Sequence, residues 1–274
     1  MMMHCASKRD GDFQNGARWV VDQECVNGGG EHTVVTTKTS LVLEQPHLLS
    51  ESICKVLNLW QARNGDAISV QDCEQRWFRA RINNLDTLEA TLTPFESIER
   101  PESALEVCVY QALPNKERFE LVLQKLTEIG VSHIVPFVSN HSSTLEERDA
   151  GQKKSHRWPD VVLRAARQCR RGCLPQLYSV QSWDDVLQQL GNWDIKIILD
   201  AKGGLWSISE AINGAQPGSV AIVVGPEGGF DDDEIVQAQQ QGAVPVKIGP
   251  RILRTESAAI VAAALVQHLA GDYV

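Results

Sequence analysis

The spacing of apolar residues divides the chain into three stretches with different periodicities. Residues 1–38 contain few large aliphatic residues and no sustained period, so we expect a partly disordered N-terminal extension, with a strand over 18–21 as the alternative. Residues 39–100 show mostly the alternation of strands, and residues 101–274 alternate between short apolar runs and helical spacing. The pattern therefore predicts an extension followed by two domains.

The middle stretch predicts a small β-rich, barrel-like domain that ends near residues 94–101. Strands are expected over 40–44, 67–70, 76–82 and 87–92, with a short helix over 47–58. In the third of these strands Trp77, Arg79 and Arg81 share one face, and Phe78, Ala80 and Ile82 share the other.

The last stretch predicts an α/β domain with a mostly parallel sheet covered on both faces. Strands are expected over 105–111, 133–138, 195–199, 220–224 and 244–248. Helices are expected over 115–129, 152–171, 182–190, 231–241 and 255–269, with Gly130 ending the first.

Composition indicates a folded, soluble protein. The 274 residues are 43% hydrophobic and 22% charged, and the longest strictly apolar run, 258–266, is too short for the roughly 20 residues that span a bilayer. Seven scattered cysteines form no disulfide framework, which favours reduced thiols in the cytoplasm. Cys169 and Cys173 lack a second ligand pair, so no metal is expected.

Charge is distributed unevenly along the chain. The net charge of −9 argues against general affinity for nucleic acids. Within 151–173, however, basic residues far outnumber the single acid, Asp160. Arg164, Arg167 and Arg171 share one face of the expected helix. Either this face is merely solvated, or it contacts phosphate groups.

A glycine-rich turn follows the strand over 220–224. Gly225, Gly228 and Gly229 permit positive φ angles and close approach of a ligand, and Asp231 with Glu234 fits a capping box. The acidic residues 231–233 would repel phosphate, so a neutral or cationic cofactor is favoured. An ordinary strand–helix turn is the alternative.

A second charged turn, over 247–259, again joins a strand to a helix. It contains Arg251, Arg254 and Glu256, with Thr255 as a plausible helix cap; solvated loop charges are the alternative interpretation. His141 lies at a strand end, where sites of α/β proteins commonly form, whereas His133 is expected to be structural. The signatures of hydrolase triads, P-loops and Rossmann dehydrogenases are absent.

Over residues 105–273 the chain resembles the RsmE family of SPOUT methyltransferases, which methylate N3 of a uridine in 16S ribosomal RNA with S-adenosylmethionine. Three stretches carry this resemblance: 116–132, Gly-Pro-Glu-Gly-Gly at 225–229, and Gly-Pro-Arg-Ile-Leu-Arg-Thr-Glu at 249–256. The first begins Lys-Glu-Arg-Phe-Glu and contains Gln-Lys-Leu-Thr-Glu-Ile-Gly. The resemblance implies a C-terminal trefoil knot, a PUA-like RNA-binding domain over 39–100, a homodimer, and ribosomal RNA or the small ribosomal subunit as partner.

The resemblance also implies roles for individual residues. The cofactor would contact Leu199, Gly225, Pro226, Glu227, Gly228, Ile248, Gly249, Arg251, Ile252 and Leu253. Arg254 would stabilise charge on the uracil carbonyls, and Glu256 would orient Arg254 or accept the N3 proton. RNA would contact Arg164, Arg167, Arg171 and His141.

Several positions depart from the family pattern. Ser52 and Asn58 stand where the family tends to have His and Arg, and His141 stands where an Arg is common. Residues 167–171 read Arg-Gln-Cys-Arg-Arg, where Glu-Gln-Ser/Cys-Gly-Arg is frequent. A methyltransferase for a different RNA position, or a non-catalytic protein of RNA binding or ribosome assembly, therefore remain alternatives. The target nucleotide, the assembly state of the substrate, the general base and the role of residues 1–38 stay open.

Overall fold

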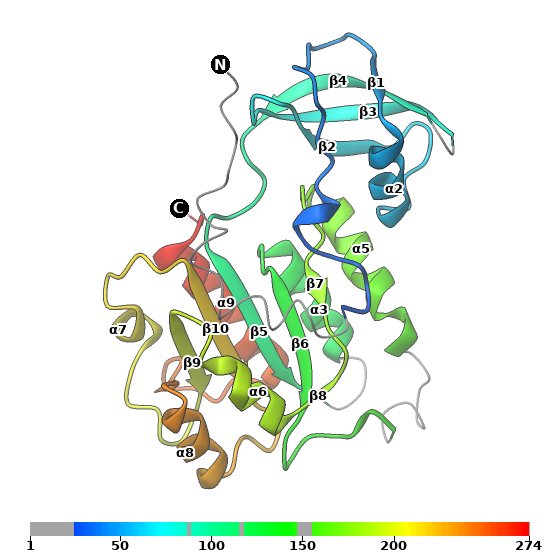
Figure 1. Cartoon of the computed structure of the whole chain (residues 1–274). Helices are drawn as coiled ribbons and strands as arrows, with labels where there is room; N and C mark the ends of the chain where they lie inside the picture. Colours follow the sequence, from blue (N-terminus) through cyan, green and yellow to red (C-terminus); the bar gives the residue numbers. More distant parts are fainter. Residues whose placement is uncertain (1–24, 87–88, 115–117, 147–154, 274) are drawn as a thin grey trace.

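The computed structural model describes residues 25–86, 89–114, 118–146 and 155–273, so the alternative strand over 18–21 lies outside the described residues. Two β-sheets dominate it (Figure 1): a four-stranded sheet above and a seven-stranded sheet below. The predicted alternation of strands and helices in the second half of the chain is confirmed, and the sheet there is parallel in every pair described.

The smaller sheet is antiparallel, in the order β1-β4-β3-β2. Its elements are β1 (His47–Leu49), α2 (Glu51–Leu59), β2 (Ala67–Gln71), β3 (Trp77–Leu85) and β4 (Ala90–Ile98). The predicted strand over 40–44 is wrong. This segment forms a turn in which Glu44 has a φ of 60° and the buried Leu41 donates its amide to the Asp72 carboxylate.

Both faces of β3 are buried around residues 77–80. Phe78 and Ala80 lie in a core that helix α5 (Trp158–Gln168) completes with Leu163 and Ala166. On the opposite face the Trp77 ring packs against Gly172, where a Cβ atom would lie 2.5 Å from the ring. Of the three residues predicted to share a face, Trp77 and Arg79 are therefore buried, and Trp77 packs against the second half of the chain. Arg81 is exposed.

The larger sheet has the order β11-β9-β10-β5-β6-β7, with β8 paired to β6. Its strands are β5 (Glu106–Ala112), β6 (His133–Val138), β7 (Gln176–Leu177), β8 (Gln181–Ser182), β9 (Ile195–Leu199), β10 (Ser219–Val224) and β11 (Val244–Val246). Its helices are α3 (Arg118–Glu128), α5 (Trp158–Gln168), α6 (Trp183–Leu190), α7 (Ile208–Ile212), α8 (Asp232–Gln240) and α9 (Thr255–Ala270). Helices α3, α5, α7 and α9 contribute to one core and α6 and α8 to a second, so both faces are covered.

Helix α5 is shorter than the predicted 152–171. A 3-10 turn, η2 (Ser155–Arg157), precedes it, and Pro159 occupies its first turn, where the missing amide hydrogen costs no helical bond. The helix ends at Gln168 because Arg170 takes a left-handed conformation, with a φ of 64°, and Arg171 donates its amide to the carbonyl of Ala166.

The segment 25–38, which the sequence assigned to the extension, contacts both sheets. The amide of Val26 donates to Leu177, and that of Gly30 to Leu174, at 2.9 and 2.8 Å. Further on, the amide of Gln71 in β2 donates to the carbonyl of Val35 at 2.8 Å. The described part of the predicted extension therefore has a defined place, and it includes a 3-10 turn, η1 (Glu31–Thr33).

Candidate functional site

The two turns singled out in the sequence meet at the carboxyl end of the parallel sheet. Thr255 joins them: its hydroxyl donates to the carbonyl of Gly225 at 2.5 Å and accepts a hydrogen bond from Gln111 Nε2 at 2.9 Å. Thr255 is the first residue of α9 and not its cap, a position that Arg254 occupies instead. The loop after β10 and the loop after β11 are thus fastened side by side, where α/β proteins commonly bind ligands.

The glycines of the first loop are needed for close packing more than for unusual backbone angles. A Cβ atom on Gly225 would lie 3.0 Å from the Phe230 ring, and one on Gly228 would lie 2.9 Å from Cβ of His141. Of the three glycines considered for positive φ, only Gly229 adopts it, at 76°. Gly228 is also exposed, so a ligand can approach the backbone there.

The capping box at the start of α8 is confirmed, and it holds the loop against β6. Glu234 accepts the backbone amide of Asp231 at 2.9 Å. The Asp231 carboxylate accepts a hydrogen bond from Asn140 Nδ2 at 3.0 Å and lies 2.6 Å from His141 Nε2. These hydrogen bonds, that of Asn140 first, lower the pKa of Asp231. His141, predicted to contact RNA, is therefore engaged with Asp231 and with the glycine loop.

Arg118 is a site residue that the sequence reasoning did not single out. Its Nη1 donates to Glu227 Oε1 at 3.0 Å, and its Nε lies 3.8 Å from Glu256 Oε1. Glu256 is 7% exposed, and its Oε2 has no hydrogen-bond partner in the described part of the chain. The available signal was that Arg118 belongs to the first stretch of the family resemblance, beside Phe119, whose ring packs in the core.

Arg254 is not the partner of Glu256. Its side chain is exposed and forms no ion pair or hydrogen bond with the residues described, whereas the charge nearest to Glu256 is that of Arg118. The predicted orientation of Arg254 by Glu256 is therefore not seen, although both side chains come from the same strand–helix turn.

The remaining predicted cofactor residues surround these loops. Leu199 ends β9 and pairs with Val246. Ile248 and Leu253 are partly buried, Pro226 is buried, and Arg251 is exposed. Gly249 has a φ of 67°, in the left-handed region that favours glycine. Ile252 is 86% exposed.

The three arginines predicted to share one RNA-facing surface do not do so. Arg164 is exposed, and among the residues described its side chain donates to the carbonyl of Asp160 at 3.2 Å. Arg167 donates to the Asp66 carboxylate at 2.5 Å. Arg171 lies beyond the end of α5 and is 6% exposed.

The prediction that Arg171 contacts phosphate is wrong, because its guanidinium is buried and each of its three nitrogens already has a partner. Its Nε lies 2.9 Å from both oxygens of Glu102, and its Nη2 lies 2.7 Å from Oε2. Its Nη1 donates to the carbonyls of Thr127 and Val131 at 2.9 and 3.2 Å. Arg171 therefore fastens the turn after α5 to Glu102 and to the end of α3.

Among the residues described, no group of three or more His, Cys, Asp and Glu side chains is placed to hold a metal ion. None of the helices there combines the length and apolar character that crossing a bilayer requires. His133, which the sequence interpretation treated as structural, is buried between Glu106 and Tyr178, at 2.6 and 3.0 Å.

Comparison with known proteins agrees with this geometry. A family model described as an RNA methyltransferase domain matches residues 101–267, which include both loops and all but β1–β4 of the strands described. Ribosomal RNA small subunit methyltransferase E of Buchnera aphidicola (subsp. Acyrthosiphon pisum) is 30% identical, over 85% of this chain and 92% of its own. The Bacillus subtilis protein of the same name is 28% identical, over 81% of this chain and 89% of its own.

Solved structures give the same result. A ribosomal RNA small subunit methyltransferase E from Neisseria gonorrhoeae, bound to S-adenosylmethionine, is 28% identical and covers 88% of this chain and 98% of its own, with a TM-score of 0.63. A Legionella pneumophila protein in complex with the same cofactor is also 28% identical, covers 87% of this chain and 98% of its own, and has a TM-score of 0.62. The chain therefore belongs to the RNA methyltransferase family that the ribosomal RNA small subunit methyltransferases E represent.

Proposed function

We propose that the chain transfers a methyl group from S-adenosylmethionine to N3 of a uridine in the RNA of the small ribosomal subunit. The observation that carries this proposal is the joining of the two family motifs, through Thr255 and Gly225, at the carboxyl end of the parallel sheet. Relatives solved with S-adenosylmethionine, which cover most of this chain, support the cofactor.

The residues of the two loops fit this cofactor. Backbone groups of Leu199, Gly225 and the 248–253 loop would hold its adenine, and the exposed backbone at Gly228 allows a ligand to approach. S-Adenosylmethionine supplies a methyl group on a positively charged sulfur. Glu227 and the acidic start of α8 suit a cationic ligand better than a phosphate-bearing one.

The chain itself must orient the uracil and remove its N3 proton, and no covalent enzyme intermediate is required. Glu256 is the candidate proton acceptor, because its Oε2 is buried without a described partner while Oε1 faces Arg118. Arg254, exposed at the start of α9, can approach the uracil carbonyls and stabilise the negative charge that develops there.

A trefoil knot is part of the proposal. The segment 246–247 is held from two sides by an earlier part of the chain: Asp200 donates its amide to Val246, and Lys247 donates its amide to Trp206, each at 2.9 Å. A Cβ atom on Gly204 would lie 2.8 Å from the backbone nitrogen of Lys247. Contacts of this kind are expected where a chain passes through a loop.

A homodimer and a PUA-like RNA-binding domain complete the proposal. Beside the cofactor loops Leu205 and Ile252 are 89% and 86% exposed and Trp206 is 51% exposed, which suits an interface with a second copy. The small antiparallel sheet would hold ribosomal RNA.

We place the protein in the cytoplasm, where that RNA and the cofactor are available.

The test is methyl transfer with identification of the product. Labelled S-adenosylmethionine is incubated with the protein and with small subunits, or free 16S RNA, that lack the modification; N3-methyluridine is expected. Another methylated nucleoside would favour the alternative RNA target that the departures at Ser52 and Asn58 suggest. Absence of transfer to either substrate would refute the proposal.

Substitution of Glu256 refines this test. Glu256→Gln should retain cofactor binding and lose about 10²–10⁴-fold in the rate of methyl transfer, the usual contribution of a general base. An unchanged rate would remove Glu256 from the reaction. Glu128→Gln, which alters a partly buried ion pair on α3 well outside the loops, is the matched control.

A further inference from the structure

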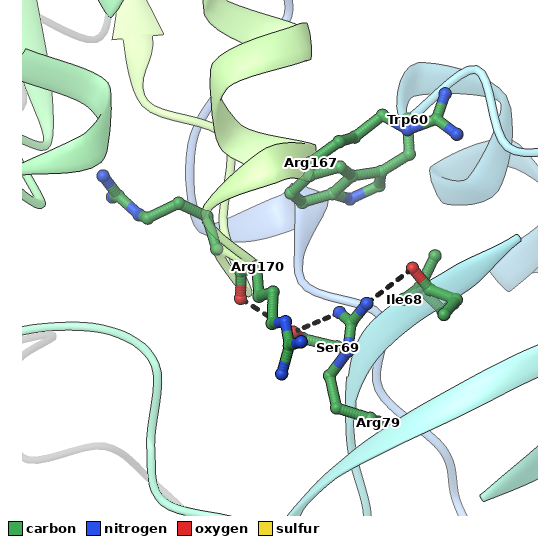
Figure 2. Close-up of a pocket in the computed structure, with 8 residues that line it drawn as sticks. Trp60, Ile68, Ser69, Arg79, Arg167 and Arg170 are labelled. Atoms are coloured by element: carbon green, nitrogen blue, oxygen red, sulfur yellow. Dashed lines mark hydrogen bonds between the residues drawn. The ribbon is translucent and has the colours of Figure 1, made fainter. Parts of the chain in front are cut away.

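A cleft lies between the small sheet and the turn after α5. It is narrow inside, its mouth opens to solvent, and it is lined by Trp60, Ala67, Ile68, Ser69, Arg79, Arg167, Arg170 and Arg171. Figure 2 shows Arg79 and Arg170 approaching one another from opposite sides, whereas the Arg167 side chain runs along Trp60 and away from them. Four of the lining residues are thus arginines, and none is an acid.

Two of these arginines are already neutralised. Arg171 is bound to Glu102, and Arg167 to Asp66. Both carboxylates hold their partners from outside the cleft lining. The remaining positive charges are those of Arg79 and Arg170.

Arg79 is a buried cation that has only neutral hydrogen-bond acceptors. It is 7% exposed, and it donates to the hydroxyl of Ser69 at 3.0 Å and to the carbonyl of Ala67 at 2.8 Å. Its cross-strand neighbour Glu96 makes no ion pair with it among the residues described, although the Glu96 charge is near enough to act on it. Burial and then the nearby charge of Arg170 lower the pKa of Arg79, and the charge of Glu96 opposes them only in part. A buried charge without an ionic partner is destabilising unless a counter-charge reaches it.

Arg170 faces Arg79 at a backbone position that disfavours arginine. Its φ is 64°, in the left-handed region, where a residue with a side chain other than Asn or Asp is uncommon. The RsmE resemblance places glycine here. Its carbonyl accepts the Ser69 hydroxyl at 2.8 Å, which fixes the turn against β2, and in Figure 2 its side chain extends toward the guanidinium of Arg79. Two guanidinium groups that have no ion-pair partner among the residues described therefore face one another.

We propose that the solvent-open mouth of this cleft is a binding site for one phosphate group, held by Arg79 and the exposed Arg170, and that under the function proposed above the group belongs to the backbone of the substrate RNA. Arginine offers phosphate a planar pair of donors, and Ser69 already aligns one of the two guanidinium groups. Because the cleft lies between the two sheets, a phosphate bound there would fix the path of the RNA from the small sheet toward the parallel sheet. A contact of this kind positions RNA without reading its bases.

The test compares the wild type with Arg170→Asn. Asparagine removes the charge and tolerates the left-handed backbone, so this variant should fold and be at least as stable as the wild type in chloride. Lys55→Gln, which removes one exposed positive charge from α2, is the matched control. The first measurement is the thermal unfolding midpoint with inorganic phosphate and with chloride at equal ionic strength. Phosphate should raise the midpoint of the wild type and of Lys55→Gln more than that of Arg170→Asn.

The second measurement is RNA affinity at several salt concentrations. Loss of one phosphate contact should lower the log–log slope for Arg170→Asn by roughly 0.7–0.9 relative to Lys55→Gln. An equal phosphate effect in all three proteins would overturn the site. A phosphate effect specific to the wild type and Lys55→Gln, with an unchanged RNA slope, would overturn its assignment to the RNA backbone. The phosphate measurement needs neither RNA nor methyl transfer, so its result stands apart from that of the methylation test.

Discussion

The buried pair of Arg171 and Glu102 gives a sharp prediction about stability. Their side chains are 6% and 14% exposed, and Glu102 additionally accepts the backbone amides of Gly172 and Cys173 at 2.8 and 3.0 Å. Glu102→Gln keeps the shape and an oxygen that can accept those amides but removes the negative charge. Arg171 then remains as a buried cation whose other acceptors are the neutral carbonyls of Thr127 and Val131.

Leaving one member of a buried ion pair uncompensated costs about 3–5 kcal/mol. We therefore expect the free energy of unfolding of Glu102→Gln to fall by that amount. Urea unfolding, followed by both tryptophan fluorescence and circular dichroism, measures it and tests for a single transition. The matched control is Glu51→Gln, because Glu51 and Lys55 form an exposed pair, with side chains 62% and 80% exposed, whose loss should cost no more than about 1 kcal/mol.

Equal losses in the two variants would refute the reasoning, since they would show that the buried position of Arg171 has no energetic consequence. A second readout separates this role from RNA binding. Arg171→Met should leave the salt dependence of RNA affinity unchanged under conditions in which the variant is folded. A lower slope of RNA affinity against salt concentration would show that Arg171 contacts phosphate after all, contrary to its position in the structure.

Three further predictions concern the candidate site. Gly228→Val should abolish binding of S-adenosylhomocysteine, measured by calorimetry, without unfolding the chain, because its Cβ would lie 2.9 Å from Cβ of His141. Thr255→Val should cost about 1–3 kcal/mol in urea unfolding and weaken cofactor binding, because the carbonyl of Gly225 loses its donor; unchanged affinity would separate the two loops functionally. The lowered pKa of Asp231 means that its ionised form stabilises the fold above the unfolded pKa of about 3.9 and that this contribution is lost as the pH falls through the folded pKa. The difference in urea midpoint between wild type and Asp231→Asn should therefore vanish in acid, and a difference that persists there would contradict it.

The sequence predicts the long periodic elements and fails where tertiary contacts decide. Strands β6 and β9 lie at the predicted residues, because apart from His133 and Lys196 each is a short apolar run rich in Ile and Val. The apolar and polar residues of segment 40–44 alternate as in a strand. The segment nevertheless forms a turn, in which the amide of Leu41 donates to the Asp72 carboxylate. Helix α7 and strands β7 and β8 were not predicted, because five residues or fewer carry too little periodicity.

The site was predictable in its loops and not in its charges. The glycine turn and the capping box are local patterns, so the sequence shows them directly. The partner of a charged residue is set by the fold: Glu256 faces Arg118, which is far away in the sequence, and Arg171 faces Glu102. Helical spacing placed Arg171 on a surface with Arg164, but the left-handed residue at 170 ends the helix first and turns Arg171 inward.

The shared core beneath the small sheet has a consequence for the order in which the protein is made. Residues 25–98 leave the ribosome before Leu163, Ala166 and Leu174 are synthesised, although these three belong to the same core as Phe78 and Leu57. Residues 25–98 therefore expose apolar surface until residues 163–174 have been synthesised. Contacts between residues so far apart in the sequence are also slow to form. Folding of the small sheet is completed from the C-terminal side, so a ribosome that stalls before residue 163 would release a half that chaperones must shield from aggregation.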